Sequence, residues 1–114
     1  MGVDMTVLPT VAAEPCCLPR QIKRADRARA VSVAAAAKTL ADPVRVEILD
    51  LLRNAAGQVC QCDLHPLFDI SQPTLSHHLK KLADADLIEV ERRGKWAYYS
   101  INDDALEVLR SWLS

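Results

Sequence analysis

The sequence has few aromatic residues, few glycines and no long hydrophobic run. Half of its 114 residues are hydrophobic, yet it contains only two tryptophans, two tyrosines and one phenylalanine. The other apolar residues are mostly alanine, valine and leucine at helical spacings, which predicts a mainly helical domain. The longest nearly uninterrupted apolar stretch, residues 31–37, is far shorter than the ~20 residues that a membrane-spanning helix needs. We therefore expect no membrane partner.

The sequence also lacks a charge excess of one sign, a targeting segment and a catalytic motif. Its formal net charge is −1, so a nucleic-acid partner has to be argued from local charge. The N-terminus has no basic region followed by an apolar core and a small-residue cleavage site, so we expect a soluble, cytoplasmic protein. The chain has no Gly-rich phosphate loop, and no nucleophile stands beside an evident base. We therefore do not expect an enzyme.

The length fits one domain with a short tail. Residues 1–22 hold three of the six prolines and show no apolar period, which predicts a flexible N-terminal arm that carries Cys16 and Cys17. The folded domain is expected over residues 23–114, beginning with a helix from about Lys23 to Leu40 that has a face of small residues.

Two helix-start signals follow. Asp42-Pro43 predicts a helix, because aspartate caps free backbone N–H groups and proline at the first helical position loses no hydrogen bond. This helix should end near Ala56-Gly57 and bury Val44, Ile48, Leu51 and Leu52. A short helix capped by Asp63 should come next, so that Cys60 and Cys62 lie just before it or at its start, with apolar contacts from Leu64, Leu67 and Phe68.

The C-terminal half contains a further helix, a hairpin and a last helix. Ser71 is expected to cap a helix whose Leu75, Leu79 and Leu82 repeat on one face. Residues 87–101 change to a period of two around Arg93-Gly94-Lys95, which predicts a β-hairpin with a basic tip. Asp103 or Asp104 should cap the last helix, which carries Leu106, Leu109, Trp112 and Leu113 on one side.

This order of elements is that of a winged helix-turn-helix, so the predicted fold is mainly α with a small β-hairpin. Residues 71–83 include two lysines, two histidines and no acidic residue, so the chain is locally basic there. The outer face of the helix that begins at Ser71 offers groups suited to base edges and phosphates of double-stranded operator DNA. The candidate DNA-binding residues are Ser71, Gln72, Thr74, Ser76, His77, His78, Lys80 and Lys81, with Arg92, Arg93 and Lys95 at the hairpin tip.

Three segments, residues 40–49, 71–82 and 93–99, closely resemble the ArsR/SmtB family of metal-sensing repressors. The resemblance covers about residues 25–113, and its middle segment, Ser-Gln-Pro-Thr-Leu-Ser-His-His-Leu-Lys-Lys-Leu, is highly specific. It implies a winged-helix homodimer that packs through its first and last helices and binds an imperfect palindrome in its own promoter. The apolar faces expected on both helices are compatible with that pairing.

Four cysteines in a reducing cytosol favour thiols that act as ligands or redox groups. Cys-Gln-Cys-Asp-Leu at residues 60–64 resembles the arsenite-responsive branch of the family, whose signature continues with a third cysteine. His65 stands at that third position here. Because three thiolates suit arsenite or antimonite, we expect Cys16 or Cys17 to complete a site with Cys60 and Cys62.

The same four cysteines also resemble the cadmium- and lead-responsive branch, and four thiolates suit a tetrahedral ion such as zinc or cadmium. His65 is either a nitrogen ligand or an ordinary, partly exposed histidine. The last helix has no histidine, unlike the zinc-responsive branch, so we do not expect a zinc site of that type.

The sequence thus predicts a repressor of a resistance operon that is released from its operator by arsenite or antimonite. Two alternatives remain open. A repressor switched by cysteine oxidation would respond to peroxide without any ion. A metallochaperone or small enzyme that uses the thiols directly would bind no promoter DNA.

Overall fold

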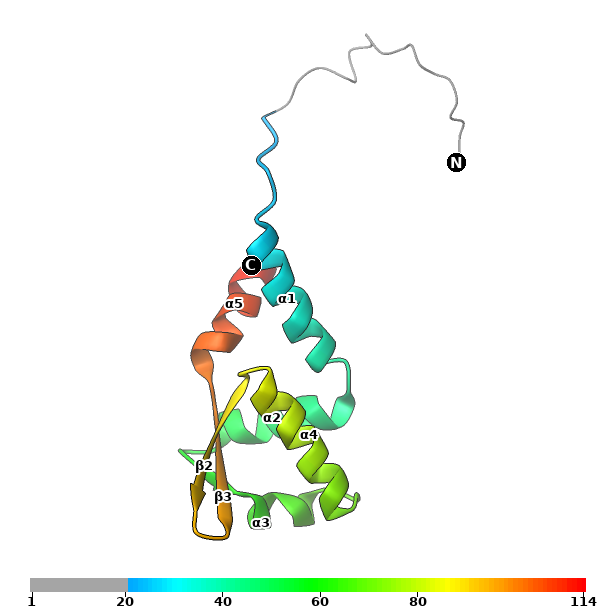
Figure 1. The fold of residues 1–114 in the computed structure, drawn as a ribbon, viewed down its shortest axis with the longest axis vertical. Helices are drawn as coiled ribbons and strands as arrows, with labels where there is room; N and C mark the ends of the chain where they lie inside the picture. Colours follow the sequence, from blue (N-terminus) through cyan, green and yellow to red (C-terminus); the bar gives the residue numbers. More distant parts are fainter. Residues whose placement is uncertain (1–20) are drawn as a thin grey trace, which may run out of the picture.

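A computed structural model describes residues 21–114 of the chain (Figure 1). Within this part the elements are α1 (Arg27–Thr39), α2 (Pro43–Asn54), β1 (Val59–Cys60), α3 (Gln61–Leu64), a single 3₁₀ turn η3 (His65–Leu67), α4 (Gln72–Asp84), β2 (Ile88–Arg93), β3 (Trp96–Ile101) and α5 (Asp103–Leu113). The mainly α architecture with a β-hairpin after the helix-turn-helix is confirmed. Cys16 and Cys17, and most of the predicted arm, lie outside the described residues.

Side-chain caps fix where most of the helices begin. The Asp42 carboxylate accepts from the Val44 N–H at 2.8 Å, and Ser71 Oγ accepts from the Thr74 N–H at 3.3 Å, so both predicted caps are confirmed. The first helix begins later than predicted, because Asp26 caps it by accepting from the Arg29 N–H at 3.0 Å. Helix α1 therefore starts at Arg27.

The predicted cap of the last helix is wrong. Asp103 and Asp104 lie in the first turn of α5, and Asn102 stands at the cap position without a side-chain hydrogen bond to the helix. The Asn102 amide donates instead to the backbone carbonyl of Asp86, at 2.8 Å. This bond joins the start of α5 to the turn between α4 and β2, while the two acidic residues still favour the helix through its dipole.

The sheet has three antiparallel strands in the order β1-β3-β2, one more than the predicted hairpin. Strand β1 pairs Val59 with Tyr99 and Cys60 with Tyr98. A strand of two residues is too short to show an alternating pattern, so β1 could not be predicted from the sequence. Hairpin β2–β3 closes at the Arg93 and Trp96 pair, and Gly94 has a φ of 62°, which glycine adopts without steric cost.

The core lies between α2, α3, α4 and the sheet. Seven side chains are almost completely buried there: Ile48, Leu52, Leu64, Leu75, Leu79, Leu82 and Leu87. The three leucines predicted for α4 are among them, so one face of α4 is held on the core and its other face is exposed. In α2 the prediction is partly wrong, because Leu49 is buried and Leu51 is exposed.

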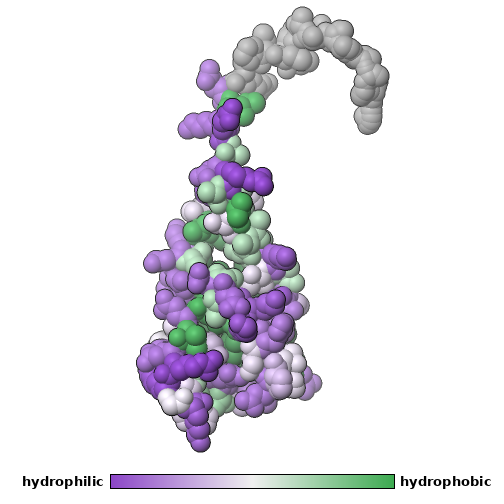
Figure 2. Space-filling model, in the orientation of Figure 1, coloured by the Kyte–Doolittle hydropathy of each residue, from purple (hydrophilic) through white to green (hydrophobic). Residues whose placement is uncertain are grey.

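Helices α1 and α5 pack side by side, and only the end of α1 and the start of α5 reach this core (Figure 1). Val33 is their only buried residue, and Val31, Val108, Trp112 and Leu113 are exposed. Figure 2 shows hydrophobic side chains interrupting the hydrophilic surface at this end of the described chain. Within residues 21–114, no helix has both the length and the apolar character needed to cross a membrane.

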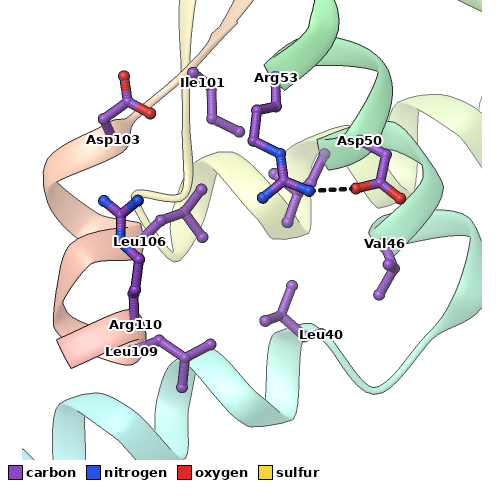
Figure 3. Close-up of a pocket in the computed structure, with 10 residues that line it drawn as sticks. Leu40, Val46, Asp50, Arg53, Ile101, Asp103, Leu106, Leu109 and Arg110 are labelled. Carbon is purple, nitrogen blue, oxygen red and sulfur yellow. Dashed lines mark hydrogen bonds and ion pairs between the residues drawn. The ribbon is translucent and has the colours of Figure 1, made fainter. Parts of the chain in front are cut away.

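A cavity of about 310 Å³ lies between the end of α1, α2 and α5. Leu40, which follows α1, and Leu106 and Leu109 of α5 point into it, and the Asp50–Arg53 ion pair of 2.8 Å lies at its α2 side (Figure 3). The packing of α1 and α5 on the body is therefore loose on this side.

Candidate nucleic-acid interface and cysteine site

Helix α4 presents most of the predicted DNA-binding residues to solvent. Seven of them are exposed: Ser71, Gln72, Thr74, Ser76, His77, Lys80 and Lys81. Ser71 and Thr74 also bond to each other through their side chains at 2.9 Å, so the first turn is preorganised by its own hydroxyl groups. Lys80 lies 3.3 Å from Asp84, an exposed pair that water screens strongly. The exposed face thus offers amide, hydroxyl, imidazole and ammonium groups along one helix.

His78 differs from the other candidates because it is half-buried on the α2 side of α4. Its Nδ1 is buried without a hydrogen-bond partner among the described residues. Burial acts to raise the pKa of the Asp42 carboxyl, but backbone N–H bonds from Val44 and Arg45 and the nearby His78 and Arg45 charges leave that pKa below its ordinary value. His78 is therefore close to the start of α2, off the outward face that His77 occupies.

The two arginines of the hairpin tip lie on opposite faces of the sheet. Arg93 donates to the Glu91 carboxylate at 3.0 Å and to Gln58, and its guanidinium lies 4.5 Å from the centre of the Tyr98 ring. The hydrogen bonds that Arg93 and Gln58 donate to Glu91 lower the pKa of the Glu91 carboxyl. The same bond to Glu91 raises the pKa of the Arg93 guanidinium. Arg93 is thus engaged within the hairpin.

Arg92 lies on the face of the hairpin that is turned towards α4. Its partner across the strands is Ala97, and Val90 and Tyr99 pair on the same face. Arg92, Val90 and Tyr99 line one side of a cavity of about 400 Å³ whose other side is α4. Within residues 21–114 the Arg92 side chain takes part in no hydrogen bond or ion pair. Arg92 therefore offers a guanidinium that is not bonded to any described side chain, beside the exposed face of α4.

The remaining tip residue, Lys95, lies over the Trp96 ring, with its Nζ 5.3 Å from the ring centre. Both residues are exposed, so the end of the hairpin combines a positive charge with an aromatic surface.

Cys60 and Cys62 lie together where β1 passes into α3. The structure joins them in a disulfide, with their Cα atoms 5.2 Å apart, and reduction would leave two thiols at the same place. Cys60 is buried and Cys62 is exposed. Cys60 Sγ also accepts from the Cys62 N–H at 3.4 Å, so Cys60 caps α3 and the predicted Asp63 cap is wrong.

No cluster of three or more metal-ligating side chains occurs within residues 21–114. The described part of the chain therefore brings together two of the four predicted cysteine ligands, Cys60 and Cys62. Cys16 and Cys17 lie outside it.

His65 follows the cysteines in the η3 turn and is half-buried. Its Nε2 lies 3.1 Å from the backbone carbonyl oxygen of Ile70. Because a carbonyl oxygen only accepts, Nε2 carries a proton and the imidazole is held against the segment that leads into α4. His65 thus has a structural contact that the sequence did not indicate.

Gln61, between the two cysteines, was not among the predicted site residues. Its amide Nε2 donates to Ser76 Oγ of α4 at 2.7 Å, and its Oε1 accepts from the Tyr99 hydroxyl of β3 at 3.4 Å. Burial raises the pKa of this Tyr99 hydroxyl. The only sequence signal for Gln61 was its place between two candidate ligands.

Comparison with known proteins places the chain in one family. The model of the bacterial regulatory protein arsR family matches residues 42–90, from the start of α2 into β2. The chain is 46% identical to the arsenical resistance operon repressor of Bacillus subtilis (strain 168), over 65% of this chain and 70% of the relative. It is 34% identical to a cadmium resistance transcriptional regulatory protein CadC homolog of Staphylococcus aureus, over 69% of this chain and 64% of the relative.

Solved structures agree with these matches. The crystal structure of the transcriptional repressor BigR from Xylella fastidiosa superposes with a TM-score of 0.61 and 30% identity, covering 74% of this chain and 85% of BigR. With the helix-turn-helix of α3 and α4 and the hairpin β2–β3 that follows it as its wing, these similarities show that the chain belongs to the arsR family of bacterial regulatory proteins.

Proposed function

We propose that this protein is a transcriptional repressor that controls an arsenic resistance operon and leaves its operator when its cysteines bind arsenite or antimonite. The observation that carries the proposal is the position of Cys60 and Cys62, whose sulfurs lie together where β1, which pairs with β3, passes into α3. The names of the arsenical resistance relatives support the same inducer. Cytoplasmic thiols would keep the pair reduced and able to bind an ion.

In the DNA-bound state, α4 enters the major groove and the hairpin β2–β3 follows the adjacent backbone. Gln72, Thr74, Ser76 and His77 face base edges or phosphates, and Lys80, Lys81, Arg92 and Lys95 face phosphates. This assignment uses the exposed face of α4 and the charge on the α4 side of the hairpin. His78 and Arg93 are assigned smaller parts, because one is turned towards α2 and the other is paired with Glu91.

The ion site needs more than the two sulfurs of residues 60 and 62. A pyramidal arsenite or antimonite centre takes three thiolates, and we assign the third to Cys16 or Cys17 on the arm of residues 1–22. Four thiolates from the same cysteines would instead suit cadmium, lead or zinc. The similarity to a cadmium resistance regulator supports this alternative.

The protein acts as a homodimer in this proposal, paired through α1 and α5. The two helices expose Val31, Val108, Trp112 and Leu113, and a second copy would remove these side chains from water. A dimer also places two copies of α4 at the spacing that a palindromic operator requires.

The test is a titration of the reduced protein on DNA from its own promoter, followed by fluorescence anisotropy at fixed salt. Arsenite and antimonite should release the wild-type protein. Cys60→Ser and Cys62→Ser variants should still bind the DNA but no longer be released, because each removes one of the two sulfurs that lie together between β1 and α3. Circular dichroism checks that both variants fold. This matters most for Cys60→Ser, because Cys60 is buried whereas Cys62 is exposed. Release of either variant at wild-type ion concentrations would show that the assigned site is wrong.

A second candidate, a repressor switched by oxidation, is favoured by the disulfide between Cys60 and Cys62. Peroxide would then release the DNA without any ion, and a thiol reductant would restore binding. Release by arsenite from protein kept fully reduced would argue against this alternative.

A further inference from the structure

One side chain joins the cysteine pair to both elements assigned to DNA. Gln61 stands between Cys60 and Cys62 in the chain, and its amide bonds to Ser76 of α4 and to Tyr99 of β3, at 2.7 and 3.4 Å. Among residues 21–114, these are the only hydrogen bonds between side chains that connect α3 with α4 or with the sheet. The bond to Ser76 lies within the exposed first half of α4, next to His77.

The surroundings of Gln61 make these bonds sensitive to its position. Gln61 is half-buried at the edge of the 400 Å³ cavity that separates α4 from the hairpin, and Tyr99 is buried. Leu79 and Val90 line the same cavity, and Lys80 and Arg92 lie at it from opposite sides. Because the cavity leaves α4 and the hairpin incompletely packed against each other here, the Gln61 amide is a direct polar bridge between them.

We infer that Gln61 is the positioning residue that passes the state of the cysteine pair to α4 and the wing, an inference that rests on the proposed function. In the reduced pair, binding an ion requires the Cys60 and Cys62 sulfurs, which lie together in the structure, to move apart around a shared centre with a third ligand. Cys60 has an extended backbone and caps α3, so this movement reorients the peptide that carries Gln61. The Ser76 bond is then lost, and α4 and the wing no longer hold one spacing.

The alternative route is the backbone. Strand β1 pairs Cys60 with Tyr98, so the sheet alone would transmit movement of the cysteines to the wing without Gln61. The two routes differ in one respect: only the Gln61 amide reaches α4.

The experiment compares Gln61→Ala with Gln58→Ala in the full-length protein. Gln58 is a matched control, because its amide bonds to Glu91 and contacts Arg93 on the hairpin but makes no bond to α4. For each variant, DNA affinity is measured with and without arsenite, and arsenite binding is measured separately by loss of free thiols. The readout is the ratio of the two DNA dissociation constants, so a change in basal affinity does not affect it.

Wild-type protein and Gln58→Ala should show a ratio in the range typical of allosteric coupling, roughly 5- to 150-fold. Gln61→Ala should bind arsenite with the same thiol stoichiometry but show a ratio near one. Gln61→Glu should restore most of the ratio, because the Ser76 and Tyr99 hydroxyls can both donate to its carboxylate.

A Gln61→Ala variant that keeps the wild-type ratio would overturn the inference and leave the backbone route. If Gln61→Ala is poorly folded, the Gln61→Glu variant decides: a ratio near one despite full arsenite binding would equally overturn it. Failure of arsenite to release the wild-type protein would be a different result, because it would overturn the proposed function itself.

Discussion

The two arginines of the hairpin provide a sharp test of how the wing meets DNA. Arg92 and Arg93 are adjacent in sequence, but Arg92 faces α4 and has no side-chain partner within residues 21–114, whereas Arg93 is paired with Glu91 at 3.0 Å. Each lysine or arginine that neutralises a phosphate contributes about 0.9 to the slope of log affinity against log salt. The neutral variants Arg92→Gln and Arg93→Gln change the charge and keep most of the side-chain volume.

We expect Arg92→Gln to reduce this slope by about 0.9 for one bound protomer, and by about 1.8 for a dimer that contacts both half-sites. Arg93→Gln should reduce the slope by less than half as much, because its charge is already compensated by Glu91 and lies on the opposite face. The DNA affinity of Arg93→Gln should still fall, since the Glu91 carboxylate then keeps its bond from Gln58 but has no cationic partner.

The assay is anisotropy of ion-free, reduced protein on a labelled operator duplex over about 50 to 200 mM salt. A non-operator duplex of the same length is the control, and it should show the same difference between the two variants because phosphates carry no sequence. Equal slopes for Arg92→Gln and Arg93→Gln, or no change in either, would show that the α4-facing side of the hairpin does not meet the phosphates.

Two further predictions concern assembly and pH. Trp112→Asp should shift the protein from dimer to monomer in sedimentation, whereas the control Trp96→Asp on the hairpin should not, although both tryptophans are about half exposed; a dimeric Trp112→Asp would place the interface elsewhere. Because the Asp42 pKa is lowered in the folded protein, its contribution to stability is present above the ordinary carboxyl pKa and is lost as the pH falls through the lowered value. The free energy of unfolding measured in urea should therefore fall less in acid for Asp42→Asn than for wild type, since asparagine also caps α2 and does not titrate. An unchanged acid dependence would contradict this.

Much of the fold follows from features that are local in the sequence. The caps at Asp42 and Ser71 set the starts of α2 and α4, since short polar side chains satisfy free backbone N–H groups. The spacing of Leu75, Leu79 and Leu82 correctly predicted which face of α4 packs on the core. The alternation of apolar and polar residues over residues 87–101 predicted the bounds of the hairpin to within one residue.

The features that could not be predicted depend on contacts between distant residues. Strand β1 exists because β3 offers an edge to Val59 and Cys60, and two residues alone carry no periodic signal. Leu49 rather than Leu51 is buried because α2 is oriented by α4 and the sheet together. The contacts of Gln61 span 15 and 38 residues, so nothing near Gln61 in the sequence identifies its partners.

The near-neutral charge of the chain is consistent with a DNA-binding switch, because what matters is where the charges lie. Acidic residues are absent from the chain between Ser71 and Ala83, and Glu91, on the hairpin, is paired with Arg93. With a net charge of −1, the protein gains little sequence-independent attraction to DNA from its overall field. Most of its operator affinity must then come from α4 and the wing acting in one geometry. In the proposed mechanism, a coupling of about 1–3 kcal/mol that disturbs this geometry is therefore enough to move the protein off its operator.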